Sequence, residues 1–273
     1  MDLIRQRLKN LLGPSGVVEA PSISAVGNWR GHPYNSPLLL RPANTEQVAA
    51  VLRLCNQYQQ PLVIHGGLSG MVGGTSSAGD EICLSLERMQ QIESIDKLGR
   101  TIIVESGVRL QEVQEAAAAE NLFFALDLGA RGSATIGGNI ATNAGGNQVI
   151  RYGMAREQVL GLEVVLADGT ILSSMNHLLK NNAGYDLKQL FIGSEGTLGI
   201  VTKAVLRLRP AMPARNTALI ATDQFDKLPR LLSHIESALG GKLSAFEAIW
   251  DNYYQLAIQG PHLGTPPLAQ RHP

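Results

Sequence analysis

The clearest hydrophobic pattern lies between Pro42 and Gln57. Apolar side chains recur there at i, i+3, i+4 and i+7, a spacing that predicts a helix with one face packed on a core. These side chains are Val48, Val51, Leu52 and Cys55. Asn44 precedes them in an N-cap position, and Gln47 stands at the third helical position. We therefore expect a capped helix in this segment.

Other periodic segments predict a mixture of strands and helices. The strands are expected at residues 62–64, 82–84, 89–95, 101–105, 162–166, 170–172, 200–208 and 218–221. Further helices are expected at residues 1–12 (a surface helix), 110–120, 185–191 and 228–239. Asp168-Gly169 predicts a hairpin with a type I′ turn, in which both central residues have positive φ. Residues 260–273 contain four prolines and no periodic element, so a loop is expected there.

Glycine is abundant and unevenly distributed. The chain of 273 residues contains 29 glycines, and 15 of them lie within residues 66–79, 129–146 and 193–199. The first glycine stretch, residues 65–74, contains no Lys or Arg, and none occurs between Arg53 and Arg88. Glycine permits positive φ and close approach, so this stretch indicates a loop that binds a diphosphate with main-chain N–H groups. A flexible surface loop is the alternative.

Two further stretches add to this picture. The second glycine stretch, residues 127–146, combines glycine with Ser, Thr, Ala and Asn, which leaves little bulk to pack and suits a flat aromatic ring system. The third, residues 193–201, ends by entering a strand. The sequence contains no G-x-x-x-x-G-K-[ST], G-x-G-x-x-G or G-x-S-x-G motif. The binding mode that these absences leave open is a nucleotide or dinucleotide held by a different arrangement of glycines.

Composition and charge exclude several classes of protein. Lys plus Arg is 23 and Asp plus Glu is 23, so no basic field exists to attract nucleic acid or an anionic membrane. Cys55 and Cys83 form no C-x-x-C pair and are expected to be buried thiols. No apolar run approaches the ~20 residues of a membrane helix, and the N-terminus lacks the apolar region of a secretory signal. We expect a soluble cytoplasmic protein.

Five ordered segments resemble the FAD-binding domain of the FAD-linked oxidases, the type first described in vanillyl-alcohol oxidase and p-cresol methylhydroxylase. They are residues 64–74, 127–146, 151–153, 161–169 and 186–202. The sequence is most similar to the D-2-hydroxyacid branch, which contains D-2-hydroxyglutarate dehydrogenase, D-lactate dehydrogenase and the glycolate oxidase FAD subunit. The resemblance implies an α+β, two-subdomain FAD-binding fold of the p-cresol methylhydroxylase type at residues 37–212. An N-terminal helix and lead-in (1–36) would precede it, and an incomplete α+β cap (substrate) domain (213–273) would follow.

The resemblance also implies which residues bind FAD. In the family, the first loop holds the pyrophosphate through main-chain N–H groups, and the second wraps the ribityl chain and flavin. Members that attach FAD covalently place a histidine directly after the Gly-Gly pair; Leu68 stands there, so non-covalent FAD is expected. The implied cofactor-binding residues are Gly66, Gly67, Leu68, Ser69, Gly70, Met71, Gly74, Leu128, Gly132, Ser133, Thr135, Ile136, Gly137, Gly138, Asn139, Ala141, Thr142, Gly199, Ile200 and Val201.

No catalytic residue is identified in the sequence. His65 is expected to be a half-buried histidine satisfied by backbone, and the remaining histidines lack metal-ligand spacing, so no metal site is expected. Arg131 and Arg151 are candidates to balance the diphosphate or a substrate carboxylate, with plain surface arginines as the alternative. The resemblance implies that the base, a metal-binding histidine and glutamate set, and the substrate arginines lie in the C-terminal substrate domain, beyond these residues.

Two functions are compatible with these observations. In the first, the chain is the FAD-binding N-terminal part of an oxidoreductase that converts a D-2-hydroxy acid (2-hydroxyglutarate, lactate or glycolate type) to the 2-oxo acid and passes electrons to an unidentified acceptor. In the alternative, it is a non-catalytic flavin-binding subunit or an inactive fragment that requires a partner. The unit after Pro213 is expected to expose an apolar sheet face, which predicts poor solubility or association, for example as a homodimer.

Overall fold

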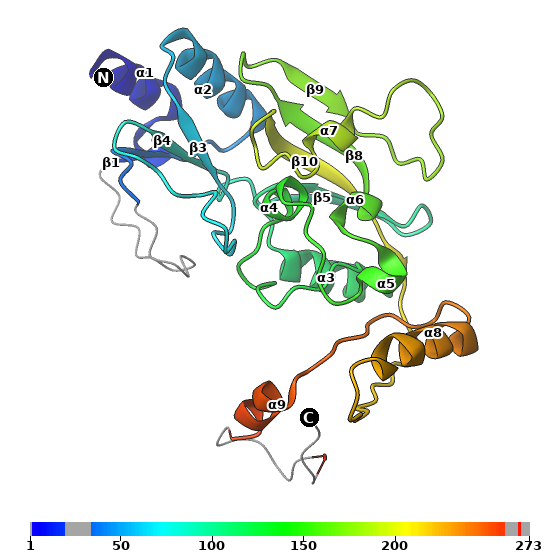
Figure 1. Ribbon diagram of the computed structural model, residues 1–273. Coiled ribbons are helices and arrows are strands. Elements are labelled where there is room, and N and C mark those ends of the chain that lie inside the picture. The colour runs from blue at the N-terminus through cyan, green and yellow to red at the C-terminus, as the bar shows by residue number, and fades with distance from the viewer. Residues whose placement is uncertain (1, 20–33, 260–266, 269–273) are drawn as a thin grey trace.

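The computed structural model describes residues 2–19, 34–259 and 267–268. Two β-sheets, each with its own hydrophobic core, form the two halves of the main body (Figure 1). This arrangement confirms the expected α+β fold with two subdomains.

The first subdomain contains a four-stranded sheet in the order β1-β2-β4-β3. Strands β2 (Leu38–Leu40), β4 (Ile82–Ser85) and β3 (Leu62–His65) are parallel, and β1 (Val17–Glu19) pairs antiparallel with β2. Helices α1 (Asp2–Leu12) and α2 (Thr45–Gln57) pack together, with the short 3-10 helix η1 (Pro14–Gly16) between α1 and β1. The expected surface helix at residues 1–12 buries its apolar face in this core, through Ile4, Leu8 and Leu12.

Helix α2 begins as the sequence predicts. The side chain of Asn44 accepts a hydrogen bond from the N–H of Gln47 at 2.9 Å, and Oε1 of Gln47 accepts one from the N–H of Ala43 at 2.8 Å. The same helix reaches the second subdomain, because Oγ1 of Thr45 donates to the Glu163 carboxylate at 2.6 Å. Helix α2 therefore joins the two subdomains.

The second subdomain contains a five-stranded antiparallel sheet in the order β5-β6-β10-β8-β9. Its strands are β5 (Ile92–Asp96), β6 (Thr101–Glu105), β8 (Val159–Val165), β9 (Ile171–Ser174) and β10 (Ile200–Arg207). A two-stranded sheet, β7 (Leu122–Phe123) with β11 (Arg209–Pro210), lies beside helix α3 (Leu110–Ala119). The second subdomain also contains four short helices: α4 (Ile136–Ala141), α5 (Val149–Tyr152), α6 (Ala155–Gln158) and α7 (Lys188–Phe191).

The turn between β8 and β9 differs from the predicted type I′ turn. Gly169 has φ of 80°, but Asp168 is absent from the residues with positive φ. The N–H of Gly169 donates to the carbonyl of Leu166 at 2.8 Å, and the N–H of Leu166 donates to the carbonyl of Thr170 at 2.9 Å. This is a three-residue loop with a left-handed glycine at its end, so the extra residue removes the need for positive φ at Asp168.

The region after Pro213 contains helices α8 (Lys227–Leu239) and α9 (Asp251–Ala257), which lie apart from both sheets (Figure 1). Neither helix has a buried residue. The strand expected at residues 218–221 is wrong: Leu219 and Ile220 are exposed, and no neighbouring strand is described to pair with them. The expected apolar sheet face is therefore not seen in this described segment, although Phe225 stacks on Trp250 at 5.6 Å between ring centroids. The loop expected at residues 260–273 lies almost entirely outside the described residues.

Candidate functional site

The first and second glycine stretches meet at the end of β3. A Cβ atom added at Gly67 would lie 1.9 Å from the carbonyl oxygen of Ser133, and one at Gly66 would lie 2.8 Å from Oγ1 of Thr135. A larger residue at Gly67 would therefore collide with backbone, so glycine is what allows the two segments to approach so closely. Two stretches that are distant in the sequence thus form one surface.

The third glycine stretch joins the same surface. The N–H of Glu195 donates to the carbonyl of Ala141 at 2.9 Å, and the N–H of Gly193 donates to the carbonyl of Ile140 at 3.0 Å, which ties the stretch to the C-terminal end of α4. A Cβ atom at Gly74, in the first stretch, would lie 3.1 Å from Oε2 of Glu195. All three stretches therefore converge.

Main-chain N–H groups are the donors that the first stretch offers. In the described part of the chain, the N–H groups of residues 66–72 make no hydrogen bond. Leu68 and Gly73 have φ of 53° and 82°, so the chain turns twice through the left-handed region. Unpaired N–H groups in such turns form concavities that bind anions. The loop can therefore bind an anion without a cationic side chain.

The second stretch contains a helix that the sequence did not predict. Helix α4 begins after Thr135, whose side chain accepts a hydrogen bond from the N–H of Gly138, and it buries Ile136 and Ile140 in the core. Asn139 on the same helix is buried, and its Nδ2 atom has no hydrogen-bond partner among the described residues. A buried amide without a partner is costly, which suggests that a bound group supplies the acceptor.

The predicted site residues differ in how much they can offer a ligand. The side chains of Ile136 and Val201 are packed in the core of the second subdomain, and Ile200 is buried in the core of the first. The hydroxyls of Ser133 and Thr142 donate within their own segment, to the carbonyls of Ala130 and Gly138. Residues with exposed surface are Gly70, Met71, Gly74, Gly132, Ser133 and Thr142, and those that are half-buried are Gly66, Gly67, Leu68, Ser69, Leu128, Gly138 and Ala141.

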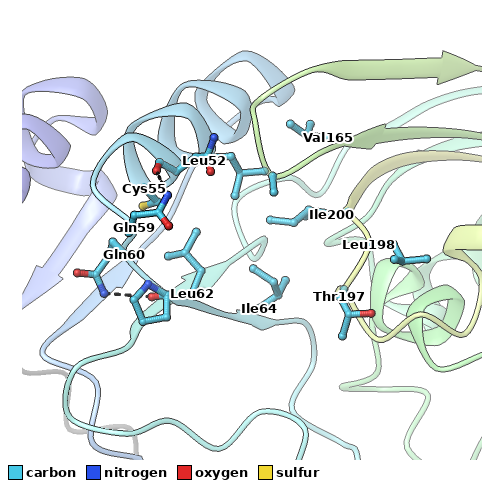
Figure 2. A pocket seen from close by; sticks show the side chains of 15 residues that line it. Leu52, Cys55, Gln59, Gln60, Leu62, Ile64, Val165, Thr197, Leu198 and Ile200 are labelled. Atoms are coloured by element: carbon cyan, nitrogen blue, oxygen red, sulfur yellow. Dashed lines mark hydrogen bonds between the residues drawn. The ribbon is translucent and has the colours of Figure 1, made fainter.

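A pocket of about 340 Å³ lies between α2 and the start of β10, where the third stretch passes the edge of β3 (Figure 2). Leu62, Ile64 and Ile200 border it, together with Leu52 and Cys55 from α2. The sequence predicted the α2 residues only as core, because helical spacing does not show which buried residues border a cavity. Gly199 and Ile200 are the pocket residues that the resemblance had implied.

The two basic candidates differ in their surroundings. Arg131 is exposed, and Arg151 lies over the ring of Tyr152 at 5.1 Å and donates to the carbonyl of Lys242 at 3.4 Å. His65 is fully buried rather than half-buried, and it does contact backbone as expected. His32, His262 and His272 lie outside the described residues.

The described residues contain no candidate metal site and no candidate membrane span. No group of three or more His, Cys, Asp or Glu side chains gathers there in a way that could hold a metal ion. No helix in that part of the chain has the length and apolar character needed to cross a membrane.

Comparison with known proteins identifies the fold and its relatives. Residues 36–174 match the FAD binding domain family. D-2-hydroxyglutarate dehydrogenase from Xanthomonas citri pv. viticola is 41% identical over 247 residues, covering 90% of this chain and 52% of the relative. The mitochondrial D-2-hydroxyglutarate dehydrogenase of Bos taurus is 43% identical over 230 residues, covering 84% of this chain and 42% of the relative. The chain thus spans about half the length of these relatives. The structure of alkyldihydroxyacetonephosphate synthase has a similar fold, with a TM-score of 0.73 at 20% identity over 88% of this chain and 46% of that one.

The chemistry of the site fits FAD. FAD carries a diphosphate between two flat ring systems, which suits a loop of unpaired N–H groups beside close-packed glycines. The Nδ2 atom of Asn139, which has no partner among the described residues, offers a hydrogen-bond donor. The pocket at α2 offers space for one of the ring systems. The chain therefore belongs to the FAD binding domain family, is related to the D-2-hydroxyglutarate dehydrogenases, and has FAD as its cofactor.

Proposed function

We propose that this chain is the FAD-binding part of a dehydrogenase that oxidises a D-2-hydroxy acid, of the 2-hydroxyglutarate, lactate or glycolate type, to the 2-oxo acid. The observation that carries the proposal is the convergence of three glycine stretches on one surface whose first loop has unpaired N–H groups. The substrate class rests on the relatives, whose names specify D-2-hydroxyglutarate. Cytoplasmic location remains a prediction, since the bovine relative is described as mitochondrial.

The proposal gives each stretch a part of the cofactor. The N–H groups of residues 66–71 would hold the diphosphate, while Gly132, Ser133 and the residues of α4 would flank the ribityl chain and the flavin. The pocket at α2 would receive the adenine, because Leu62 and Ile64 offer it apolar surface, Gln59 and Gln60 offer polar groups, and Gly199 and Ile200 also line it. Leu68 has no side-chain atom that could bond to the flavin, so binding would be non-covalent.

Oxidation of a 2-hydroxy acid also requires a base for the hydroxyl proton and cations for the carboxylate. When bound, FAD supplies the acceptor for the hydride that leaves C2. The residues described here would bind and orient that cofactor. By the family resemblance we expect the base, the metal ligands and the substrate arginines in a substrate domain, outside the FAD-binding residues described here. The electron acceptor is unidentified.

The visible spectrum of the purified protein tests the proposal directly. We expect flavin absorption bands at close to one FAD per chain, released into the supernatant on acid precipitation because binding is non-covalent. A colourless protein that stays colourless after incubation with excess FAD would refute FAD binding. Bands that remain in the precipitate would refute the non-covalent form.

Ligands that carry one part of FAD test the adenine pocket. ADP should compete with FAD for the apoprotein, and FMN should bind at least ~10-fold more weakly than FAD because it lacks the adenosine. Equal affinities for FMN and FAD would contradict the role of the pocket.

An activity assay separates the main proposal from its alternative, a non-catalytic flavin-binding subunit or inactive fragment that needs a partner. The 273-residue protein is assayed with D-2-hydroxyglutarate, D-lactate and glycolate and a dye acceptor. We expect the 273-residue protein to bind FAD without turnover, and turnover to begin when the C-terminal half of a relative is added. Robust turnover by the chain alone would show that the catalytic groups are present in it.

A further inference from the structure

His65 lies at the start of the first glycine stretch. It is the last residue of β3, it pairs with Ser85 of β4, and its side chain is 1% exposed. Its Nε2 atom lies 3.1 Å from the carbonyl oxygen of Thr75. The two ends of the loop, residues 65 and 75, are therefore joined by one imidazole.

The geometry fixes the protonation of the ring. A carbonyl oxygen only accepts, so Nε2 must carry a proton and donate it to Thr75. Nδ1 lies 3.5 Å from the hydroxyl oxygen of Tyr34, whose ring packs at 5.1 Å between centroids. Burial lowers the pKa of His65, which favours the neutral ring with Nδ1 as an acceptor.

The loop has few other internal restraints. The N–H groups of residues 66–72 have no partner among the described residues. The N–H of Ser76 donates to the carbonyl of Gly73 at 3.0 Å, and Ser77 forms a β-bridge with Tyr34. The side chains of Met71 and Val72 are exposed, so packing adds little at the tip. The bond from His65 to Thr75 is thus the side-chain contact that closes the loop.

We infer that His65 is a positioning residue for the cofactor diphosphate: its Nε2–H bond to the carbonyl of Thr75 holds the loop between them in the conformation that binds the diphosphate through its unpaired N–H groups. This inference rests on the proposed function and adds a role for a side chain that does not itself contact the cofactor. A closed loop binds more tightly because less conformational entropy is lost on binding.

Two substitutions that differ by one methylene test the role. Gln places its amide nitrogen near the position of Nε2, whereas Asn places it near Nδ1. We expect His65→Gln to bind ADP and FAD within about threefold of wild type, and His65→Asn and His65→Phe to lose ~10-fold, the loss of one buried hydrogen bond. Tyr34→Phe, which keeps the ring beside His65 and removes the hydroxyl near Nδ1, is the matched control and should bind like wild type.

Hydrogen exchange of the apoprotein provides a readout that needs no cofactor. The N–H groups of Ser76 and Leu86, which donate to the carbonyls of Gly73 and His65, should exchange faster in His65→Asn and His65→Phe. His65→Gln should stay close to wild type, and peptides elsewhere should be unchanged. Equal ADP affinity and equal exchange in the Gln and Asn variants would overturn the inference. If wild type bound neither ADP nor FAD but the exchange pattern held, the proposed function would fail while the loop-closing role of His65 remained. Should His65→Phe fail to fold, the comparison of Gln with Asn decides.

Discussion

Substitutions at two glycines of the first stretch should have different effects, one on folding and the other on cofactor binding. Gly67 faces the backbone at Ser133, whereas nothing lies within 4 Å of a Cβ atom at Gly70. Gly70 is also absent from the residues with positive φ, so a side chain there causes no left-handed strain. A substitution at Gly70 should therefore act on the ligand alone.

We predict that Gly67→Ala destabilises the protein by about 3 kcal/mol through its clash with Ser133. Gly70→Val should leave the melting temperature unchanged but weaken FAD binding by at least ~10-fold, because its side chain would occupy the space of the diphosphate. Thermal unfolding and FAD titration of both variants check this. Normal FAD affinity of a folded Gly70→Val protein would contradict diphosphate binding at this loop.

At the scale of elements, the capped start of α2 offers a clean test. Asn44→Ala should lower the free energy of unfolding by about 1 kcal/mol, because the N–H of Gln47 loses its acceptor. Asn44→Asp and Asn44→Ser keep an acceptor and serve as controls. Denaturant unfolding measures the difference. An unchanged midpoint for the Ala variant would show that the cap adds nothing.

The elements predicted well are those with strong local signals. Helix α2 has a cap and a continuous apolar face, and β6 has the predicted bounds, residues 101–105. Helix α4 was missed because Gly137 and Gly138 disfavour a helix, and only burial of Ile136 and Ile140 and the cap at Thr135 overcome this preference. The strand at residues 218–221 was predicted from a β-like run alone, and such a run needs a neighbouring strand to pair with.

The site was predictable in its segments but not in its shape. Glycine clustering marked all three stretches, and the structure brings them together. The pocket combines α2, β3 and β10, which are far apart in the sequence, so no local pattern could reveal it. The contact between His65 and Thr75 is likewise invisible in sequence, since it depends on how the loop returns to β3.

At the scale of the whole molecule, every buried core residue in the described ranges lies between Ile4 and Leu208. We predict that a protein ending at residue 212 unfolds with a melting temperature close to that of the full chain and binds FAD equally well. It should also associate less, because it lacks exposed apolar groups such as Phe225 and Trp250. Calorimetry and sedimentation of the two proteins provide the measurements. A large loss of stability would place residues 213–273 in the folding unit.

The absence of Lys and Arg between Arg53 and Arg88 has a further consequence. Dipoles of peptide groups act at short range and release no counterions, so mobile ions screen them far less than they screen exposed ion pairs. FAD retention should therefore hardly change between dilute buffer and 1 M NaCl, measured as the fraction of flavin left on the protein after desalting. Steep loss of flavin with ionic strength would instead reveal a cationic side chain at the diphosphate.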